Sequence, residues 1–367
     1  MPTFSRQHLE EAARRIFAAA GCGPAEAGIM ARSLVRANLV GHDSHGVIRI
    51  PQYLESVARG RAVPGASADV LAETPASACL DGNWGFGQPI AHRATQIGVT
   101  KAKQCGVAAV TVRRANHMGR MGEYVEAAAA QGAIGLLFCN IHGTAACTVP
   151  WGGREPRLGT NPVAASLPRP PGWSLVLDMA TSAVAEGKVR VLRNRGERTP
   201  VGWILDGEGR PTTDPEAFYE AGNHGSLLPF GGGAGHKGYG LSVVVDLLAG
   251  ALSGAGATSG RDGRFGNAIF LLVLDVAQFV PLDEFARAVS QFEAFLKSSA
   301  PAPGYREVLV PGEVEQRCAE ARGAAGIYVE EETWAQVLAG AERVGARLPD
   351  CQVPDYQAPG DQVPGEA

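Results

Sequence analysis

Two imidazoles, a hydroxyl, a carboxylate and a guanidinium lie within nine residues near the start of the chain, in the segment Gly41-His42-Asp43-Ser44-His45-Gly46-Val47-Ile48-Arg49. A histidine titrates near neutral pH, so His45 can exchange a proton with a substrate oxygen. Arg49 can hold a carboxylate through two parallel N–H bonds. Together these two residues predict a site for a small 2-oxo or 2-hydroxy acid.

A three-histidine metal site made by His42, His45 and His117 is the alternative interpretation. We disfavour it because the H-x-x-H spacing lies on no helix that would place both rings on one face. We therefore expect no metal. A hydrogen-bonded structural role in a tight turn suits His42 by itself.

The segment Asn116-His117-Met118-Gly119-Arg120-Met121-Gly122 follows a predicted strand at 107–112 and leads into a predicted helix at 121–131. Proteins of the α/β class place ligand-binding residues outside the carboxyl ends of their strands. His117 is therefore the second catalytic candidate. The alternative is that Asn116 caps the helix and His117 is incidental.

Gly233-Ala234-Gly235-His236-Lys237-Gly238 matches the G-x-G-x-x-G pattern, but no predicted strand precedes it. The strand-turn-helix context of a Rossmann fingerprint is therefore missing. A glycine-rich helix N-terminus still favours an anion, and Lys237 adds a positive charge. We expect a cofactor phosphate there without a Rossmann fold.

Asp178-Met179-Ala180-Thr181-Ser182 begins at the end of a predicted buried strand, 175–178. Its carboxylate could orient an imidazole, which makes Asp178 a catalytic candidate, and its hydroxyls could bind a nicotinamide amide or a ribose. Capping of the following helix is the alternative role for Asp178. Gly159-Thr160-Asn161-Pro162 has turn chemistry that could be purely structural.

The elements that position these residues follow from hydrophobic periodicity and from helix-capping residues. Helices are expected from Ser5, as the N-cap, to Ala20, from Pro24 to about Asn38, and from Pro51 to Gly60, so that the His45 segment lies in the turn between two helices. From about residue 76, short β-branched runs alternate with Ala-rich runs, which indicates an α/β fold. Further predictions are strands at 133–139 and 269–274 and a buried helix at 241–252.

The chain has 367 residues, of which 45% are hydrophobic, and single cores usually stop growing at about 250 to 300 residues, so we expect more than one domain. A net charge of −4 with scattered Lys and Arg residues argues against a nucleic-acid partner. The absence of a signal-like leader and of a long apolar stretch predicts a cytoplasmic protein with no membrane partner. The seven cysteines contain no C-x-x-C pair, which argues against a disulfide framework and a structural zinc.

Taken in order, the motifs resemble those of the malate/L-lactate dehydrogenase family of the second type, which is unrelated to the Rossmann-fold lactate and malate dehydrogenases. The resemblance covers most of the chain. The segments that carry it are 44–47 with Arg49, 116–117 with Gly119, 159–162, 177–182, 211–215, 235–240 and 311–313. Such an ordered set is far more specific than any one of its members.

The resemblance implies an oxidoreductase that uses NAD or NADP, acts on a small carboxylate substrate and is usually a homodimer. The implied fold is α/β (mixed α+β), with a non-Rossmann mixed-sheet NAD(P)-binding domain at residues 76–281. A helical domain for substrate binding and dimerisation would combine residues 1–75 with 282–348. Residues 349–367 are rich in Pro, Gly, Gln and Asp and would form a flexible tail.

By the family pattern, His45 is the proton donor to the substrate carbonyl, His117 is an active-site residue, and Ser44 and Arg49 bind the carboxylate end of the substrate. The residues expected to contact the cofactor are Thr160, Asp178, Met179, Ala180, Thr181, Ser182, His236, Lys237, Gly312 and Glu313. Two segments depart from the family pattern. Glu186 stands where members commonly carry a basic residue, and the loop Asn140-Ile141-His142-Gly143-Thr144 lacks the usual proline.

The function predicted from the sequence is reversible hydride transfer between a nicotinamide and the C2 atom of a 2-oxo acid. The nearest alternative is reduction of a cyclic imino acid such as Δ1-piperideine-2-carboxylate or Δ1-pyrroline-2-carboxylate, because the same resemblance includes such reductases and the site would need the same carboxylate clamp. A second alternative is a non-catalytic, metabolite-binding relative that kept the fold.

Overall fold

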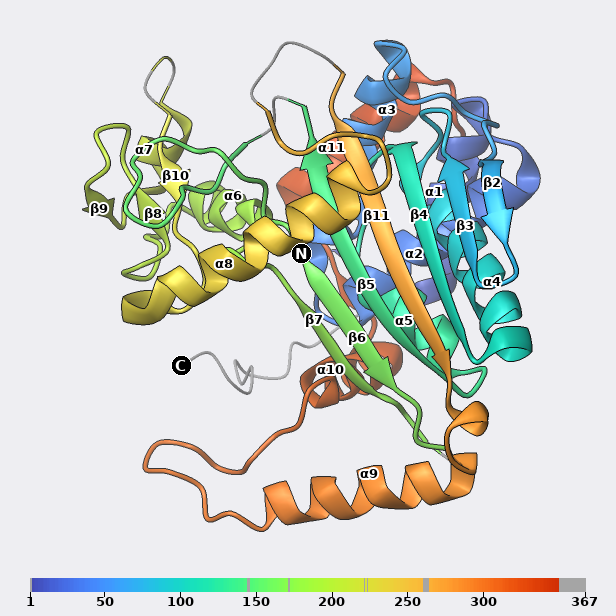
Figure 1. The fold of residues 1–367 in the computed structure, drawn as a ribbon. Helices are drawn as coiled ribbons and strands as arrows, with labels where there is room; N and C mark the ends of the chain where they lie inside the picture. The colour runs from blue at the N-terminus through green and yellow to red at the C-terminus, as the bar shows by residue number, and fades with distance from the viewer. Residues whose placement is uncertain are drawn as a thin grey trace.

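The computed structural model describes residues 2–143, 146–170, 172–220, 222, 224–259 and 264–349. Thr144 and the predicted tail beyond Pro349 lie outside this part of the chain. At the centre of the fold is a seven-stranded sheet (Figure 1). In spatial order its strands are β2 (Asp69–Thr74), β3 (Ser77–Asp81), β4 (Val107–Ala115), β11 (Gly266–Asp275), β5 (Ala133–His142), β6 (Val163–Leu167) and β7 (Leu175–Met179).

The strand directions decide the fold class. Within the central sheet, β3 and β4 run parallel, whereas every other neighbouring pair is antiparallel. A doubly wound dinucleotide-binding sheet needs successive parallel strands joined by crossover helices. Here β11 instead enters between β4 and β5 and is antiparallel to both. The predicted mixed α/β fold with a non-Rossmann sheet is confirmed.

Helices cover both faces of this sheet (Figure 1). On one face, α4 (Gly87–Cys105) packs on β4 and β11, and α5 (Gly122–Ala129) packs on β5 and β6. On the other face, α8 (Gly235–Val245) continues as a π-helical segment, Asp246–Ala251, that packs on β5 and β11. One face of β5 and β11 is fully buried in the main apolar core, whereas most of the alternate side chains, on the other face, are half-buried.

Two predictions of burial were wrong. The helix expected at 241–252 exists, but Leu247 and Leu252 are 51% and 58% exposed because only one side of this helix faces the sheet. The strand expected at 175–178 is β7, which lies at the edge of the sheet and exposes Leu177. Apolar periodicity alone cannot distinguish an edge position from a central one.

Both ends of the described chain meet in a helical layer. α1 (Arg6–Ala19), α2 (Pro24–Leu39) and α3 (Ile50–Ala58) share one apolar core with α11 (Glu331–Arg343). The predicted N-cap is confirmed, since Ser5 Oγ accepts from His8 N at 3.1 Å. The strand β1 (Thr3–Phe4) pairs with β12 (Ile327–Tyr328), and α10 (Glu313–Ala325) packs against α2.

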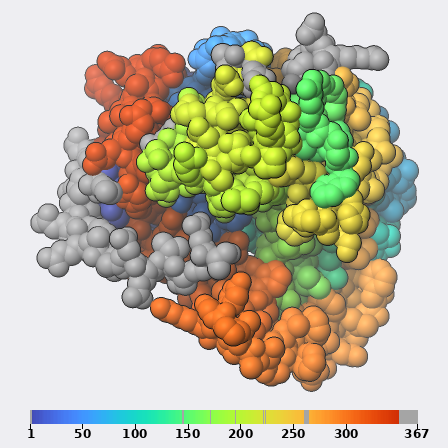
Figure 2. Space-filling view, turned by 90° about the vertical axis from the view of Figure 1, so that its left-hand side faces the viewer, coloured from blue at the N-terminus to red at the C-terminus, as the bar shows by residue number. Residues whose placement is uncertain are grey.

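A small lobe follows β7 and has its own apolar cluster, which includes Val189 and Phe218. It contains α6 (Glu186–Arg195), α7 (Pro215–Tyr219) and the short strands β8 (Ile204–Leu205), β9 (Pro211–Thr212) and β10 (Ser226–Leu227). Figure 2 looks onto this lobe, coloured yellow-green, between the red C-terminal helices and the gold α8 segment.

The helix α9 (Leu282–Lys297) runs along the lower edge of the molecule in Figure 1, away from the helical layer. It is amphipathic, yet Phe292 and Phe295 are 58% and 73% exposed. None of the described helices combines the length and the hydropathy that a bilayer crossing requires.

Candidate active site

The segment that contains His45 and Arg49 lies between α2 and α3. It forms two consecutive 3₁₀ turns, η1 (Asp43–His45) and η2 (Val47–Arg49). Asn38 ties them together, because its Nδ2 donates to Asp43 Oδ1 at 2.7 Å and its Oδ1 accepts from Val47 N at 2.9 Å. A Cβ atom on Gly46 would lie 2.1 Å from Asn38 Oδ1. Gly46 is therefore required by packing, and the segment is pinned before any ligand binds.

The C-terminal helix α10 braces the same segment. Arg322 donates to both carboxylate oxygens of Asp43, at 2.7 and 2.9 Å. His42 Nε2 lies 3.2 Å from Glu315 Oε1. Both His42 and Asp43 are thus engaged in structural contacts, and among the described residues no group of three potential metal ligands occurs.

The loop after β4 brings His117 against His45. The two rings stack with their centroids 5.5 Å apart and an interplanar angle of 19°. Ser44 Oγ lies 3.0 Å from His45 Nδ1, and Tyr53 Oη lies 2.7 Å from His117 Nδ1. Gln88 Nε2 donates to the same Tyr53 hydroxyl at 2.9 Å. The two histidines that the sequence singled out therefore form one site.

Both rings are neutral at pH 7. Burial, followed by the positive charge of Arg49, holds the pKa of His45 well below its ordinary value. Burial, Arg49 and Arg190 lower the pKa of His117 to about 3. Burial also raises the pKa of Tyr53 to about 12, so its hydroxyl keeps its proton. Any positive charge in this site is carried by guanidinium groups.

Arg49 is buried and only partly occupied by protein partners. Its Nε donates to the Ser44 carbonyl oxygen at 2.6 Å and its NH1 donates to Gln52 Oε1 at 2.7 Å. Its NH2 group enters no hydrogen bond recorded within the described part of the chain and faces the start of α6, 3.1 Å from where a Cβ on Gly187 would lie. The NH2 group is therefore the part of this guanidinium without a recorded acceptor among the described residues.

Glu186 and Arg190 lie beside Arg49, and the sequence did not indicate this position for either of them. Glu186 Oε1 accepts from Arg190 NH2 at 2.9 Å and from Tyr219 Oη at 2.7 Å. The sequence marks Glu186 only as a departure from the family pattern. The i, i+4 spacing of Glu186 and Arg190 is the local signal for their pairing once they lie on a helix. No local pattern indicates that α6 packs on η1.

Arg120 was also missed, although it lies in the motif that contains His117. Its side chain is 1% exposed, its NH2 donates to Glu126 at 2.7 Å, and its Nε lies 3.8 Å from Asp178 Oδ2. Its Nε and NH1 groups have no hydrogen-bond partner among the residues that the structure describes. A buried cation with spare donors thus lies near His45 and Asp178.

Asp178 lies at the end of β7, where its Oδ2 accepts from Gly122 N at 2.7 Å. Gly122 is the first residue of α5, so the carboxylate caps an earlier helix rather than the one that follows it. Capping of α5 therefore occupies one carboxylate oxygen of Asp178. The local sequence did not suggest this helix as the one that Asp178 caps.

Most of the predicted cofactor residues form a second group at that end of β7. Thr181 donates to the Thr160 carbonyl oxygen through both N, at 2.9 Å, and Oγ1, at 3.0 Å. Met179 ends β7, Ala180 follows it half-buried, and Ser182 is buried with its Oγ bonded to the Val184 carbonyl oxygen.

The N-terminus of α8 lies beside this group, because Phe230 N donates to the Thr181 carbonyl oxygen and a Cβ on Gly238 would collide with Phe230. His236 and Lys237 are exposed in the first turn of α8. Lys237 takes part in no ion pair recorded among the described residues, and the space around Gly233 is open.

Gly312 and Glu313 lie near the other end of β7. A Cβ on Gly312 would be 3.0 Å from Val176 N, and φ at this glycine is +88°. The carboxylate of Glu313 is bound by Lys297 at 2.6 and 2.7 Å and also by Arg317. Its oxygens are therefore occupied by protein cations.

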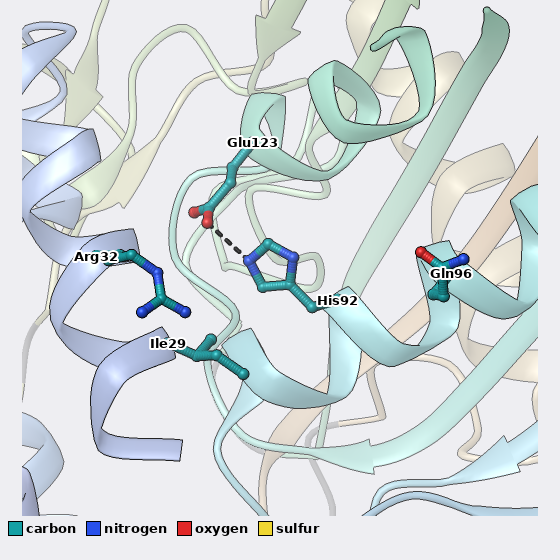
Figure 3. A pocket seen from close by; sticks show the side chains of 5 residues that line it. All are labelled: Ile29, Arg32, His92, Gln96 and Glu123. Atoms are coloured by element: carbon teal, nitrogen blue, oxygen red, sulfur yellow. Dashed lines mark hydrogen bonds and ion pairs between the residues drawn. The ribbon is translucent and has the colours of Figure 1, made fainter. Parts of the chain in front are cut away.

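A cavity of about 330 Å³ lies elsewhere, between α2, α4 and α5. Figure 3 shows its lining, with His92 Nε2 2.7 Å from Glu123 Oε1. The lining residues are Ile29, Arg32, His92, Gln96 and Glu123. None of the residues predicted for catalysis, substrate binding or cofactor binding is among them.

The chain is similar to characterised dehydrogenases over most of its length. It is 40% identical to an L-lactate dehydrogenase of Cupriavidus necator over 291 residues, which cover 78% of this chain and 82% of that protein. Its fold matches malate dehydrogenase of Pyrococcus horikoshii with a TM-score of 0.85, at 33% identity over 95% of this chain and 97% of that one.

A third similar structure is Δ1-piperideine-2-carboxylate reductase of Pseudomonas syringae, with a TM-score of 0.78 and 31% identity over 93% of this chain and 100% of that one. The family model for malate/L-lactate dehydrogenase matches residues 4–338. The chain therefore belongs to the malate/L-lactate dehydrogenase family of oxidoreductases, whose chemistry uses a nicotinamide cofactor.

Proposed function

We propose that this protein interconverts a small 2-oxo acid and its 2-hydroxy acid by hydride transfer to and from NAD or NADP. The observation that supports the proposal most directly is the stacked pair His45 and His117 beside the buried, half-occupied Arg49. A proton donor and a carboxylate clamp held in one rigid site meet the main demands of the reaction, because positioning removes much of the barrier.

Arg49 is the proposed clamp for the carboxylate of the substrate. Its NH2 group has no recorded acceptor in the described part of the chain, and Ser44 adds a hydroxyl next to His45. A carboxylate bound in this buried place would form charge-assisted hydrogen bonds, which are about twice as strong as neutral ones. The C2 oxygen of the same substrate would then face the histidine pair.

His45 is the proposed proton donor and acceptor. In the free site its pKa is held down by burial and by Arg49, so the ring is neutral. A bound carboxylate offsets the charge of Arg49 and raises the pKa of both histidines. Substrate binding thus loads the site with the proton that reduction of the carbonyl consumes.

The cofactor site is proposed at the Thr160, Thr181 and α8 region. The exposed first turn of α8, with Lys237 unpaired among the described residues, fits a phosphate group. Asp178, fixed by Gly122 N, lies between this region and Arg120. A bound nicotinamide supplies or accepts the hydride, and the protein residues orient it and the substrate.

Reduction of a cyclic imino acid is the second candidate. It is favoured by the similarity to the piperideine-carboxylate reductase, and such a substrate needs the same clamp at Arg49. Turnover of Δ1-piperideine-2-carboxylate without turnover of any 2-oxo acid would decide for it.

A homodimer is proposed for the quaternary structure. Phe292 and Phe295 lie three residues apart on α9 and are both exposed, and neighbouring exposed apolar side chains often mark a protein interface. Replacing Phe295 with Asp should shift a dimer toward monomer in analytical ultracentrifugation. Val201→Asp, at a residue that is 85% exposed away from α9, is the matched control. A wild-type monomer would refute the proposal.

The function is tested by following reduced-nicotinamide absorbance with NADH and with NADPH against pyruvate, oxaloacetate, 3-sulfopyruvate and Δ1-piperideine-2-carboxylate. Turnover of a 2-oxo acid that His45→Ala abolishes, with cofactor binding retained, is the expected result. Binding of cofactor with no turnover of any acid or imine would instead indicate a non-catalytic relative. Loss of cofactor binding together with activity would give His45 a structural role.

A further inference from the structure

The first turn of α6 closes over the proposed carboxylate clamp. A Cβ on Gly187 would lie 2.8 Å from Ser44 Cβ and 3.1 Å from Arg49 NH2, so only a glycine permits this approach. Glu186, the residue before it, is the first of the helix. The small lobe therefore places a carboxylate close enough to Arg49 for the two charges to interact.

Glu186 is a charged group in this place. Burial opposes its ionisation, but Arg190, Arg49 and Tyr219 together hold the pKa of its carboxyl below the ordinary value. The carboxylate is three-quarters buried and is bound by Arg190 through both oxygens, at 2.9 and 3.1 Å, and by Tyr219. It is fixed in orientation and is present as an anion at neutral pH.

The charges around the pocket can be counted. Arg49 and Arg190 contribute two positive charges and Glu186 removes one, while His45 and His117 are neutral. Arg120 and Arg36 together are offset by Glu126 and Asp178. One net positive charge remains, which the carboxylate at C1 of a substrate would balance. A second anionic group would meet Glu186 in a partly buried site, where like charges repel strongly.

We infer that the substrate carries a single negative charge: a 2-oxo or 2-hydroxy monocarboxylate with a neutral side chain, in preference to a dicarboxylate or a sulfonated acid. This inference rests on the proposed function, since it assumes that Arg49 binds the C1 carboxylate. Glu186 is its specificity-determining residue. A side chain that donates a hydrogen bond, such as a hydroxyl, matches the acceptor that Glu186 presents.

Exclusion of dianionic acids by the charge of Glu186 can be distinguished from a purely structural role of this residue. If Glu186 only held α6 in place, its loss would weaken every acid alike. If Arg190 instead released Glu186 and bound the second carboxylate of a dicarboxylate ligand, the wild-type protein would favour the dicarboxylate. If Glu186 acts through its charge alone, removing that charge should change the ratio of the binding affinities for a monocarboxylate and a dicarboxylate.

The test is isothermal titration of the full-length protein with L-lactate and with L-malate in the presence of NADH or NADPH, so that no reaction occurs. Wild type should bind lactate at least about tenfold more tightly than malate, and Glu186→Gln should reduce that ratio about tenfold. Glu186→Asp keeps the charge and should retain the wild-type ratio. Glu216→Gln removes a comparable α6–α7 ion pair, with Arg193, away from Arg49 and should also retain it.

Tighter binding of malate by wild type, or an equal loss of both ligands in Glu186→Gln, would overturn the inference. If the binding ratios are as predicted but the protein turns over no acid or imine, the proposed function is contradicted and the inference about charge selectivity still holds. Failure of wild type to bind either acid would overturn both.

Discussion

Tyr53 Oη and His117 Nδ1 lie 2.7 Å apart in a buried chain that begins at Gln88. We assign the Tyr53 hydroxyl proton to the contact with His117 Nδ1, because the Gln88 amide already donates to this hydroxyl. His117 therefore accepts at Nδ1 and carries its own proton on Nε2. The protein thus fixes one tautomer, with the N–H group available to a ligand beside His45.

Removing this contact should slow the chemical step. Tyr53→Phe keeps the aromatic ring beside Phe17 and Phe86 but frees the His117 tautomer. We expect kcat to fall about tenfold to a hundredfold with a small change in the KM of the acid. Tyr328→Phe, at an exposed tyrosine, should leave kcat unchanged. Equal kcat values for Tyr53→Phe and wild type would show that the tautomer is unimportant.

Carboxylate binding should be accompanied by proton uptake. Arg49 lowers the pKa of both His45 and His117, and a bound carboxylate offsets its charge, so the pKa values rise on binding. Titration with oxamate in buffers of different ionisation enthalpy, between about pH 5.5 and 7.5, should show uptake that grows as pH falls. Heats that do not depend on the buffer across this range would contradict the coupling.

Gly187→Ala should damage the clamp without disturbing the cofactor. The new Cβ would collide with Ser44 and approach Arg49 NH2. We expect the KM of the acid to rise at least about tenfold and stability to fall by about 1 to 3 kcal/mol, the usual result of overpacking. The Kd of the cofactor should not change. Gly323→Ala on α10, with open space around it, should be neutral or stabilising, and an equal effect of both variants would refute the argument.

Acid should destabilise the fold through the buried histidines. The unfolded-state pKa of histidine is about 6.5, whereas that of His117 is about 3 in the folded state. Between these values only the unfolded chain binds the proton, so stability falls as pH falls, by at most about 1.4 kcal/mol per pH unit and histidine. Above about pH 6.5 this contribution is complete and constant.

Urea unfolding at several pH values measures this dependence. His117→Asn can still accept from Tyr53 but does not titrate, so its free energy of unfolding should vary less steeply with pH than that of wild type. Identical slopes for the two proteins would assign the acid sensitivity to other groups.

The sequence by itself identified the family and the mixed fold class, and it singled out the two histidines that stack in the candidate site. It could do so because the chemistry of a side chain follows from its residue type, and because the order of motifs along the chain can be read without knowing which residues are in contact. The helices at 6–19 and 24–39 and the strand at 107–115 were also predictable, since their periodicity and caps are local.

Only the tertiary structure decided what these residues do to one another. Asp178 caps α5 rather than the next helix, Arg120 is buried with spare donors, and Glu186 lies beside Arg49. Each of these follows from contacts between segments far apart in the chain, which no local pattern encodes. Burial, which only packing creates, also lowers the pKa values of His45 and His117, so that Arg49 rather than either histidine carries positive charge at this place at neutral pH.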